Sequence, residues 1–167
     1  MYRLKFSILI PTYNGANLIG ETLRSVLSQD FDNYEIIIQE DASGDNIEEV
    51  IKSFSNSKIK FFRNQKNLGY SINLEEGRKN CTGDIIYLMG QDDILGSGAL
   101  LDTHEVFADD DNIGAVTRPY YWFDKDIKVP VRAKEQLNPK QNEIIKITDS
   151  IEKIIAVFKT LDQLSGL

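Results

Sequence analysis

The sequence FSILIPTYNG, at residues 6–15, joins a short apolar run to a polar loop that begins at Pro11. An apolar run of this length, ended by proline, is typical of a buried strand. The following stretch, residues 18–29, carries apolar side chains on one helical face. This order of strand, loop and amphipathic helix predicts the start of a βαβ unit.

The same alternation continues through residue 118. Further strands are predicted at residues 35–38, 59–62, 85–89 and 113–117, and further helices at residues 47–54, 71–79 and 98–107. Alternating strands and helices predict an α/β fold, an open, doubly wound, mostly parallel sheet flanked by helices, as in Rossmann-like proteins.

A change of pattern follows Pro119. Residues 120–123 are aromatic, residues 125–141 are polar, and a helix is predicted from residue 148 onward. We therefore predict two parts, an α/β core at residues 1–118 and a second region at residues 119–167. An exposed aromatic run also predicts self-association into a homo-oligomer.

Composition excludes several classes of protein. The chain has 167 residues and a net charge of −7, which disfavours a nucleic-acid partner. Its single cysteine, Cys81, cannot form an internal disulfide and fits a reducing compartment. The sequence contains neither a signal peptide nor an apolar run of membrane-spanning length. The expected location is cytoplasmic, or peripheral to a membrane through partners or another segment.

Polar residues follow three of the predicted strands, at residues 11–15, 40–45 and 90–93. Ligands of open parallel sheets bind outside the carboxyl ends of the strands, so these loops are expected to converge. Tyr13 offers a ring for stacking on a base, and Asp41 can accept a hydrogen bond from a ring N–H. Asp92 and Asp93 suit a divalent cation held together with phosphates.

Each loop also has a simpler interpretation. Residues 41–45 can be the N-cap of a helix, residues 92–93 a solvated turn, and residues 11–15 a plain loop. Their shared position after apolar strands favours a binding site. The sequence lacks a Walker-type loop and a Gly-x-Gly-x-x-Gly motif after the first strand, which argues against nucleotide hydrolysis and dinucleotide binding.

Five motifs in order resemble those of the family 2 inverting glycosyltransferases. They are SILIPTYN at residues 7–14, SVLSQ at 25–29, EDASGD at 40–45, NLG at 67–69, and GD at 83–84 ahead of DD at 92–93. The resemblance covers residues 5–118.

This resemblance implies the GT-A fold, a UDP-sugar or dTDP-sugar donor, and Mn²⁺ or Mg²⁺. The substrate-binding residues that it implies are Pro11, Thr12, Tyr13, Glu40, Asp41, Asn67, Gly69, Gln91 and Asp92. Within this set, Pro11 and Tyr13 would line the base pocket, and Asp41 would bind the ring. Asp92 would bind the metal, with Asp93 beside it. The implied acceptor is a hydroxyl group of a glycan or a lipid-linked sugar.

Three positions depart from the family pattern. Glu40 replaces the first Asp of the base-binding pair, Gly90 replaces the first Asp of Asp-x-Asp, and Leu74 stands where Arg is common. An inverting transferase also needs a general base. In the family this base follows a segment that resembles residues 164–167, so we expect it beyond Leu167 and expect these 167 residues to be truncated.

The leading hypothesis is therefore a glycosyltransferase that moves a sugar from a nucleotide diphosphate to a hydroxyl acceptor with inversion. The alternative is a non-catalytic module that binds a nucleotide or a partner on the same fold, which Gly90 favours. A third hypothesis, a signalling domain with an acidic pocket, predicts a lysine after the fifth strand. Thr117, Arg118 and Pro119 stand there instead.

Overall fold

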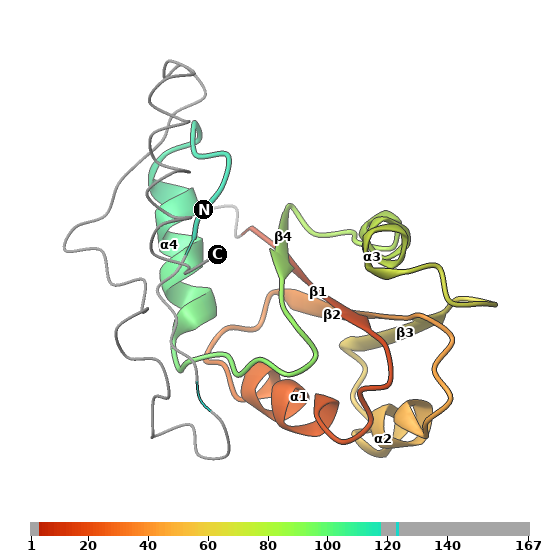
Figure 1. The fold of residues 1–167 in the computed structure, drawn as a ribbon. Coiled ribbons are helices and arrows are strands. Elements are labelled where there is room, and N and C mark those ends of the chain that lie inside the picture. The colour runs from red at the N-terminus through yellow and green to blue at the C-terminus, as the bar shows by residue number, and fades with distance from the viewer. Residues whose placement is uncertain (1–3, 118–122, 124–167) are drawn as a thin grey trace. The chain divides into compact units, whose positions relative to one another are not determined.

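The computed structural model describes residues 4–117 and residue 123. The chain divides into two compact units, Met1–Glu105 and Val106–Leu167. The first unit contains four strands, three complete helices and the start of a fourth helix (Figure 1). In chain order these elements are β1 (Phe6–Thr12), α1 (Ile19–Leu27), β2 (Tyr34–Glu40), α2 (Ile47–Ser53), β3 (Ile59–Arg63), α3 (Tyr70–Lys79), β4 (Ile85–Leu88) and α4 (Ala99–Asp109).

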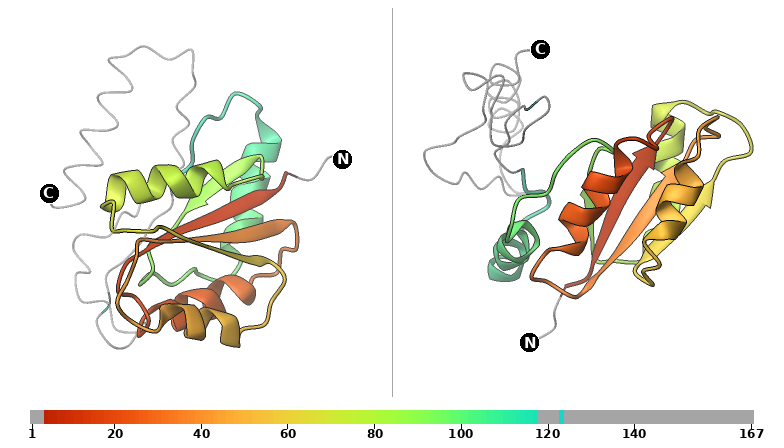
Figure 2. Two further views of the ribbon diagram at one scale, coloured as in Figure 1. Left: turned by 90° about the vertical axis from the view of Figure 1, so that its right-hand side faces the viewer. Right: turned by 90° about the horizontal axis from the view of Figure 1, so that it is seen from below.

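The four strands form one open sheet in the order β3-β2-β1-β4, and every neighbouring pair is parallel. Helix α3 lies on one face of the sheet, and α1 and α2 lie on the other (Figure 2). The predicted doubly wound parallel sheet is confirmed.

The main hydrophobic core lies on the α1–α2 face. Alternate residues of β1, namely Phe6, Ile8 and Ile10, belong to one buried cluster with residues of α1 and α2. Alternation follows from the pleat of a strand, which turns successive side chains to opposite faces. Leu9 is also buried, on the face that α3 covers. Both faces of the central strands are thus buried, although the face that α3 covers also carries the polar residues Ser7, Glu35 and Gln39.

Strand β1 continues beyond Pro11, where we expected it to end. Its pairing with β4 ends at Leu9, whereas its pairing with β2 continues to Thr12. Proline has no N–H to donate, and it is tolerated where a strand has lost a neighbour. Pro11 therefore lies on a stretch of β1 that has one partner strand instead of two.

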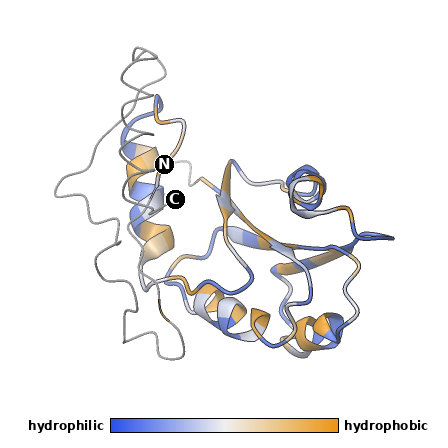
Figure 3. Cartoon of the chain, in the orientation of Figure 1, coloured by the Kyte–Doolittle hydropathy of each residue, from blue (hydrophilic) through white to orange (hydrophobic). Residues whose placement is uncertain are grey.

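Helix α3 packs on the sheet without an apolar stripe of its own. Its surface is mainly hydrophilic (Figure 3), and its buried residues are Asn73 and Gly77. A Cβ atom at position 77 would lie 2.6 Å from Cδ1 of Leu9 and 2.9 Å from Cβ of Gln39. Gly77, which weakened the helix prediction, is the residue that lets α3 approach β1 and β2 closely.

A buried carboxylate holds the amino ends of the strands. Glu35 accepts hydrogen bonds from Ser7 Oγ at 2.7 Å, from Thr82 N at 2.8 Å and from Lys60 Nζ at 2.7 Å. Burial opposes ionisation, but the hydrogen bonds from Lys60, Ser7 and Thr82 outweigh it and hold the pKa of the Glu35 carboxyl well below its usual range. This network joins β1, β2 and β3 to the turn before β4.

The predicted fifth strand at residues 113–117 is wrong. Within the described part of the chain, Ile113 forms an isolated bridge and residues 114–117 form no strand. Gly114 and Ala115 are exposed there, so this stretch lacks the burial that stabilises the other strands.

Three other predictions fall on residues 120–122, 125–141 and 148–167, which lie outside the described residues. The division at residue 118 remains a prediction. No helix among the described residues is long and apolar enough to span a membrane.

Candidate functional site

The loops at the carboxyl edge of the sheet are cross-linked by side chains. The β1–α1 loop, residues 13–18, is bonded to the β2–α2 loop, residues 41–46, at two points. Asn14 N donates to Ser43 Oγ and Ala16 N donates to Asp45 Oδ2, both at 2.8 Å. The convergence that strand order predicted is therefore present. Asp45, the last residue of the EDASGD motif, has a structural role in it.

A second set of bonds ties the β1–α1 loop to the β4–α4 loop, residues 89–98. Tyr13 N donates to Gln91 Oε1 at 3.0 Å, and Gln91 Nε2 donates to Tyr13 O at 3.1 Å. Thr22 Oγ1 on α1 donates to Gln91 O at 2.7 Å. The Gln91 side chain, which the resemblance placed against substrate, is thus occupied by the backbone of Tyr13.

Within the stretch FSILIPTYNG, Tyr13 is the one residue with a large side chain that is exposed to solvent. Pro11 and Thr12 are buried in β1, whereas Tyr13 is 48% exposed. Asn14 has a φ of 50°, a left-handed conformation that turns the chain sharply after Tyr13. The predicted stacking residue is therefore available to a ligand, whereas Pro11 and Thr12 are buried within the fold.

Asp41 is 2% exposed and its carboxylate already accepts three hydrogen bonds. Oδ1 accepts from Asn64 Nδ2 and Leu68 N, both at 2.8 Å, and Oδ2 accepts from Gly69 N at 2.9 Å. A carboxylate has about four acceptor positions, so one position, on Oδ2, has no partner among the described residues. Asp41 also organises the β3–α3 loop, residues 64–69.

Glu40 is fully buried, and both of its carboxylate oxygens contact other residues of the protein. Its Oε1 accepts a short hydrogen bond from Ser43 N, and its Oε2 lies 3.1 Å from Arg63 Nε, an ion pair outside hydrogen-bond geometry. Arg63 Nη2 also donates to Ser43 O at 2.7 Å. Strand register places Glu40 directly beside Arg63. Together these two residues shape the β2–α2 loop, in which Ala42 has a φ of 57°.

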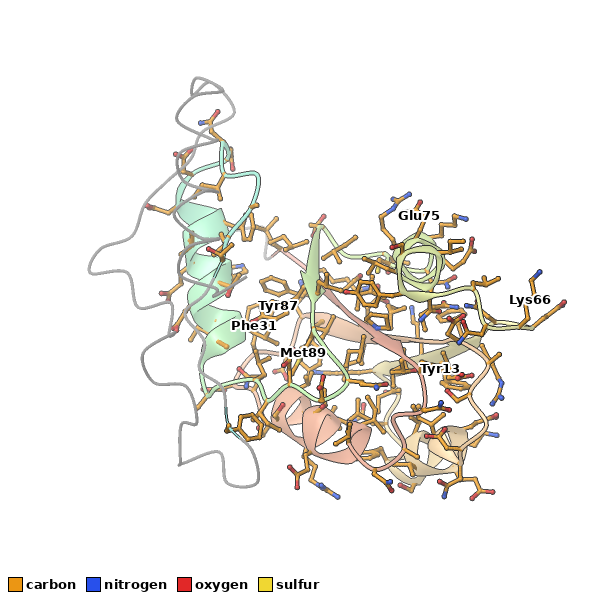
Figure 4. The ribbon with its side chains drawn as sticks, in the orientation of Figure 1. Tyr13, Phe31, Lys66, Glu75, Tyr87 and Met89 are labelled. Atoms are coloured by element: carbon orange, nitrogen blue, oxygen red, sulfur yellow. The ribbon has the colours of Figure 1, made fainter. Side chains whose placement is uncertain are left out.

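Asn67 and Gly69 lie in the second half of the β3–α3 loop. Asn67 Oδ1 accepts from Gly69 N at 3.1 Å, and Gly69 has a φ of 80°, which favours glycine. The N–H of Gly69 is therefore shared between Asn67 and Asp41. Lys66 extends into solvent from the same loop (Figure 4).

A network of amide side chains supports this loop and was missed in the sequence. Gln39 Nε2 donates to Asn64 Oδ1 at 2.9 Å, and Asn64 Nδ2 donates to Asn73 Oδ1 at 2.8 Å. Asn73 Nδ2 donates to Gln39 O at 3.0 Å, and Asn80 Nδ2 donates to Gln39 Oε1 at 3.1 Å. The network links Asp41, through Asn64, to α3. Its sequence signal was the set of asparagines in and around α3, namely Asn64, Asn73 and Asn80.

Asp92 and Asp93 are exposed beside Gly90. A Cβ atom at position 90 would lie 3.0 Å from Asp92 Oδ1 and 2.8 Å from Asp93 Oδ2, so both carboxylates approach one point. Asp93 Oδ2 also accepts from Gly90 N at 2.9 Å. Asp93 therefore lies against the backbone of Gly90, the position at which the acid is missing.

These residues fit a cation that is held by one or two carboxylates and by phosphates. No cluster of three acidic, histidine or cysteine residues occurs in the described part of the chain, so the site does not fit a cation held by protein alone.

A hollow of about 490 Å³ is lined by Asn64, Gln65, Lys66, Leu68 and Glu76. Its lining includes neither Tyr13 nor Asp92, so this hollow does not coincide with the candidate site formed by the loops. Cys81 is unsuited to nucleophilic chemistry, because burial raises the pKa of its thiol. His104 packs on the Phe31 ring, with centroids 5.2 Å apart.

Comparison with proteins of known sequence supports the resemblance. A GalNAc(5)-diNAcBac-PP-undecaprenol beta-1,3-glucosyltransferase of Campylobacter jejuni is 33% identical over 99 residues, 58% of this chain and 32% of that protein. A poly-beta-1,6-N-acetyl-D-glucosamine synthase of Staphylococcus epidermidis is 34% identical over 112 residues, 66% of this chain and 27% of that protein. The chain thus spans about a third of the length of these relatives.

Solved structures share the fold. S. aureus TarS 1–349 in complex with UDP-GlcNAc matches with a TM-score of 0.61 and 25% identity, over 64% of this chain and 32% of that one. A mannosyltransferase from Pyrobaculum calidifontis, in complex with GDP-Man and Mn²⁺, matches with a TM-score of 0.61 and 22% identity, over 71% and 37%. The model of the family described as glycosyl transferase family 2 matches residues 7–160. The chain therefore has the GT-A fold and belongs to glycosyl transferase family 2.

Proposed function

We propose that the chain binds a UDP-sugar, or a dTDP-sugar, together with Mn²⁺ or Mg²⁺. The observation that carries the proposal is the joining of the Tyr13, Asp41 and Asp92 loops at one edge of the sheet. The hydrogen bonds Tyr13–Gln91 and Asn14–Ser43 hold these loops together. A ring-stacking residue, a hydrogen-bond acceptor and a pair of carboxylates are the groups that a base, its imide N–H and a metal-bound diphosphate require.

The base would lie on Tyr13 and donate its ring N–H to Asp41. Uracil and thymine have one such N–H between two carbonyl groups, which matches the single remaining acceptor position on Oδ2. Guanine presents two adjacent donors and would use both oxygens of a carboxylate. Oδ1 of Asp41 is filled by Asn64 and Leu68, so this arrangement favours a pyrimidine nucleotide over GDP.

The diphosphate would lie near Asp92, with the cation between them. A bound cation would neutralise the charge that develops on the leaving nucleoside diphosphate. Asp93 is expected to contribute less than Asp92, because its Oδ2 already accepts the Gly90 N–H.

In the transfer we propose, an acceptor hydroxyl oxygen bonds to the anomeric carbon as the bond from that carbon to the diphosphate oxygen breaks. The displacement inverts the anomeric centre, and a base removes the hydroxyl proton. We assign that base to no residue among those the structure describes. The names of the relatives, which include undecaprenol-linked acceptors and a polysaccharide, support a glycan or lipid-linked acceptor.

Titration calorimetry with UDP tests the proposal, in the presence and absence of Mn²⁺. We expect Mn²⁺ to tighten UDP binding, and we expect Asp92→Asn to abolish that gain. Asp30→Asn is the matched control, since it removes one exposed acidic charge. Asp30 follows the carboxyl end of α1, whereas the β1–α1 loop with Tyr13 precedes its amino end. Wild-type affinity for UDP that does not depend on Mn²⁺, or a gain that survives in Asp92→Asn, would contradict the metal assignment.

The alternative is a module that binds a nucleotide without catalysis, and Gly90 favours it by leaving one acid fewer near the metal. Slow release of free sugar from a UDP-sugar in the presence of Mn²⁺ separates the two. A transferase site hydrolyses its donor at a low rate that Asp92→Asn removes. A binding module leaves the donor intact.

A further inference from the structure

Gln91 lies shortly after Leu88, the last residue of β4 and the last that pairs with β1. The last paired residues are Leu9 and Leu88, and Met89 N then donates to Leu9 O. Beyond this point the strands β1 and β4 form no further ladder pairs. The Gln91 side chain restores the contact, because its amide exchanges two hydrogen bonds with the backbone of Tyr13. The pair resembles one rung of a β-ladder, with a side-chain amide in place of a peptide.

The contact is closely packed on its other sides. A Cβ atom at position 15 would lie 2.2 Å from Gln91 Oε1 and 2.6 Å from Gln91 Cδ, so the amide fits only against a glycine. The backbone of Gln91 is held as well, since buried Thr22 donates to its carbonyl. Gln91 therefore has a fixed position relative to both the β1–α1 loop and α1.

The two loops that this contact joins have different proposed ligands. Tyr13 would bind the base, and Asp92, adjacent to Gln91 in sequence, would bind the metal and the diphosphate. A bound nucleotide would touch both at once. The distance between these two loops must then match the length of the nucleotide, and a positional error between binding groups reduces their joint contribution.

We propose that Gln91 is a positioning residue that couples base binding at Tyr13 to metal binding at Asp92. It does so through the paired hydrogen bonds of its side-chain amide. This inference rests on the proposed function, because it needs a nucleotide that reaches from one loop to the other. It differs from the role that the resemblance implied, in which Gln91 contacts substrate directly.

Two variants remove the contact independently. Gln91→Met keeps the length of the side chain and loses both hydrogen bonds. Gly15→Ala keeps the glutamine at position 91 but puts a methyl group where the side-chain amide of Gln91 lies. Gln65→Met is the matched control, because it removes the same amide from an exposed glutamine for which the described part of the chain shows no hydrogen bond. Thermal melting of each variant checks that it is folded.

Calorimetry with UDP, with and without Mn²⁺, measures the coupling on the full chain. We expect both variants to reduce the Mn²⁺-dependent gain in UDP affinity by about fivefold or more, the lower end of typical coupling between sites. Without Mn²⁺, UDP affinity should change by less than about threefold, because the base contact alone does not depend on Asp92. Hydrogen exchange of the Tyr13 amide should become faster in both variants.

An unchanged gain in folded Gln91→Met and Gly15→Ala would overturn the proposal. An equal loss with and without Mn²⁺ would also overturn it, since that result indicates collapse of the loop and no specific coupling. A wild-type protein without any Mn²⁺-dependent gain would instead refute the proposed function, and the role of Gln91 with it.

Discussion

Replacement of Asp41 by asparagine should change which nucleotide binds. The side chain keeps its size, and one oxygen can still accept from Asn64 and Leu68. The new amide nitrogen would then stand in place of Oδ2. Gly69 N loses its bond to that oxygen but retains Asn67 Oδ1 at 3.1 Å, so the β3–α3 loop should survive.

The expected magnitude follows from the acceptor positions of Asp41. The single free position on Oδ2 is the one assigned to the uracil N–H, and a hydrogen bond to a charged group contributes about 1.5–3 kcal/mol. Its loss should weaken UDP binding by about 10-fold to 150-fold. The amide can instead donate to N3 of cytosine, so CDP binding should become about 2-fold to 10-fold tighter.

Calorimetry with UDP and CDP on the wild type and Asp41→Asn measures both effects, with Asp30→Asn as the control for loss of an acidic charge. A ratio of UDP to CDP affinity that stays the same in Asp41→Asn would refute the assignment of Asp41 to the base. Because the ratio compares two ligands on one protein, general destabilisation cannot produce the expected change.

Three further predictions concern stability. Glu35→Gln should lower the free energy of unfolding at neutral pH by about 2 kcal/mol. In the wild type the lowered pKa of Glu35 adds stability above about pH 4.5, the usual carboxyl pKa, and this is lost as the pH falls further. Urea unfolding between pH 7 and pH 2.5 should therefore show a smaller loss in Glu35→Gln than in the wild type, and parallel curves would contradict this. Gly77→Ala gains about 1 kcal/mol of helix propensity but forces a methyl group against Leu9, and overpacking costs about 1–3 kcal/mol. Its melting temperature should fall, and a rise would show that α3 can shift freely. Asn73→Ala should destabilise the fold by about 1–3 kcal/mol, because it removes one hydrogen-bond partner from the Gln39 carbonyl and one from the Asn64 amide, which keeps its bond to Asp41. It should also weaken UDP binding, which calorimetry would test, with Asn112→Ala as an exposed control.

The sequence alone predicted the parallel sheet, the alternation of helices and strands, and the edge at which the loops meet. Those predictions rest on hydrophobic periodicity and on proline and glycine positions, which are local properties of the chain. The same signals failed at residues 113–117, where no residue of an apolar-looking stretch is fully buried. Local pattern says that a strand can form, but a strand also needs a partner and burial.

The tertiary structure decided what each loop residue does. The motif EDASGD suggested two carboxylates facing a ligand, whereas Glu40 is buried against Arg63 and Asp41 retains one acceptor position. Glu40 and Arg63 meet because β2 and β3 pair in one particular register. Gln91 reaches Tyr13 because β4 lies beside β1, although 78 residues separate them. Side-chain hydrogen bonds depend on strand order and register to within a fraction of an ångström, and periodicity in a sequence carries no information at that scale.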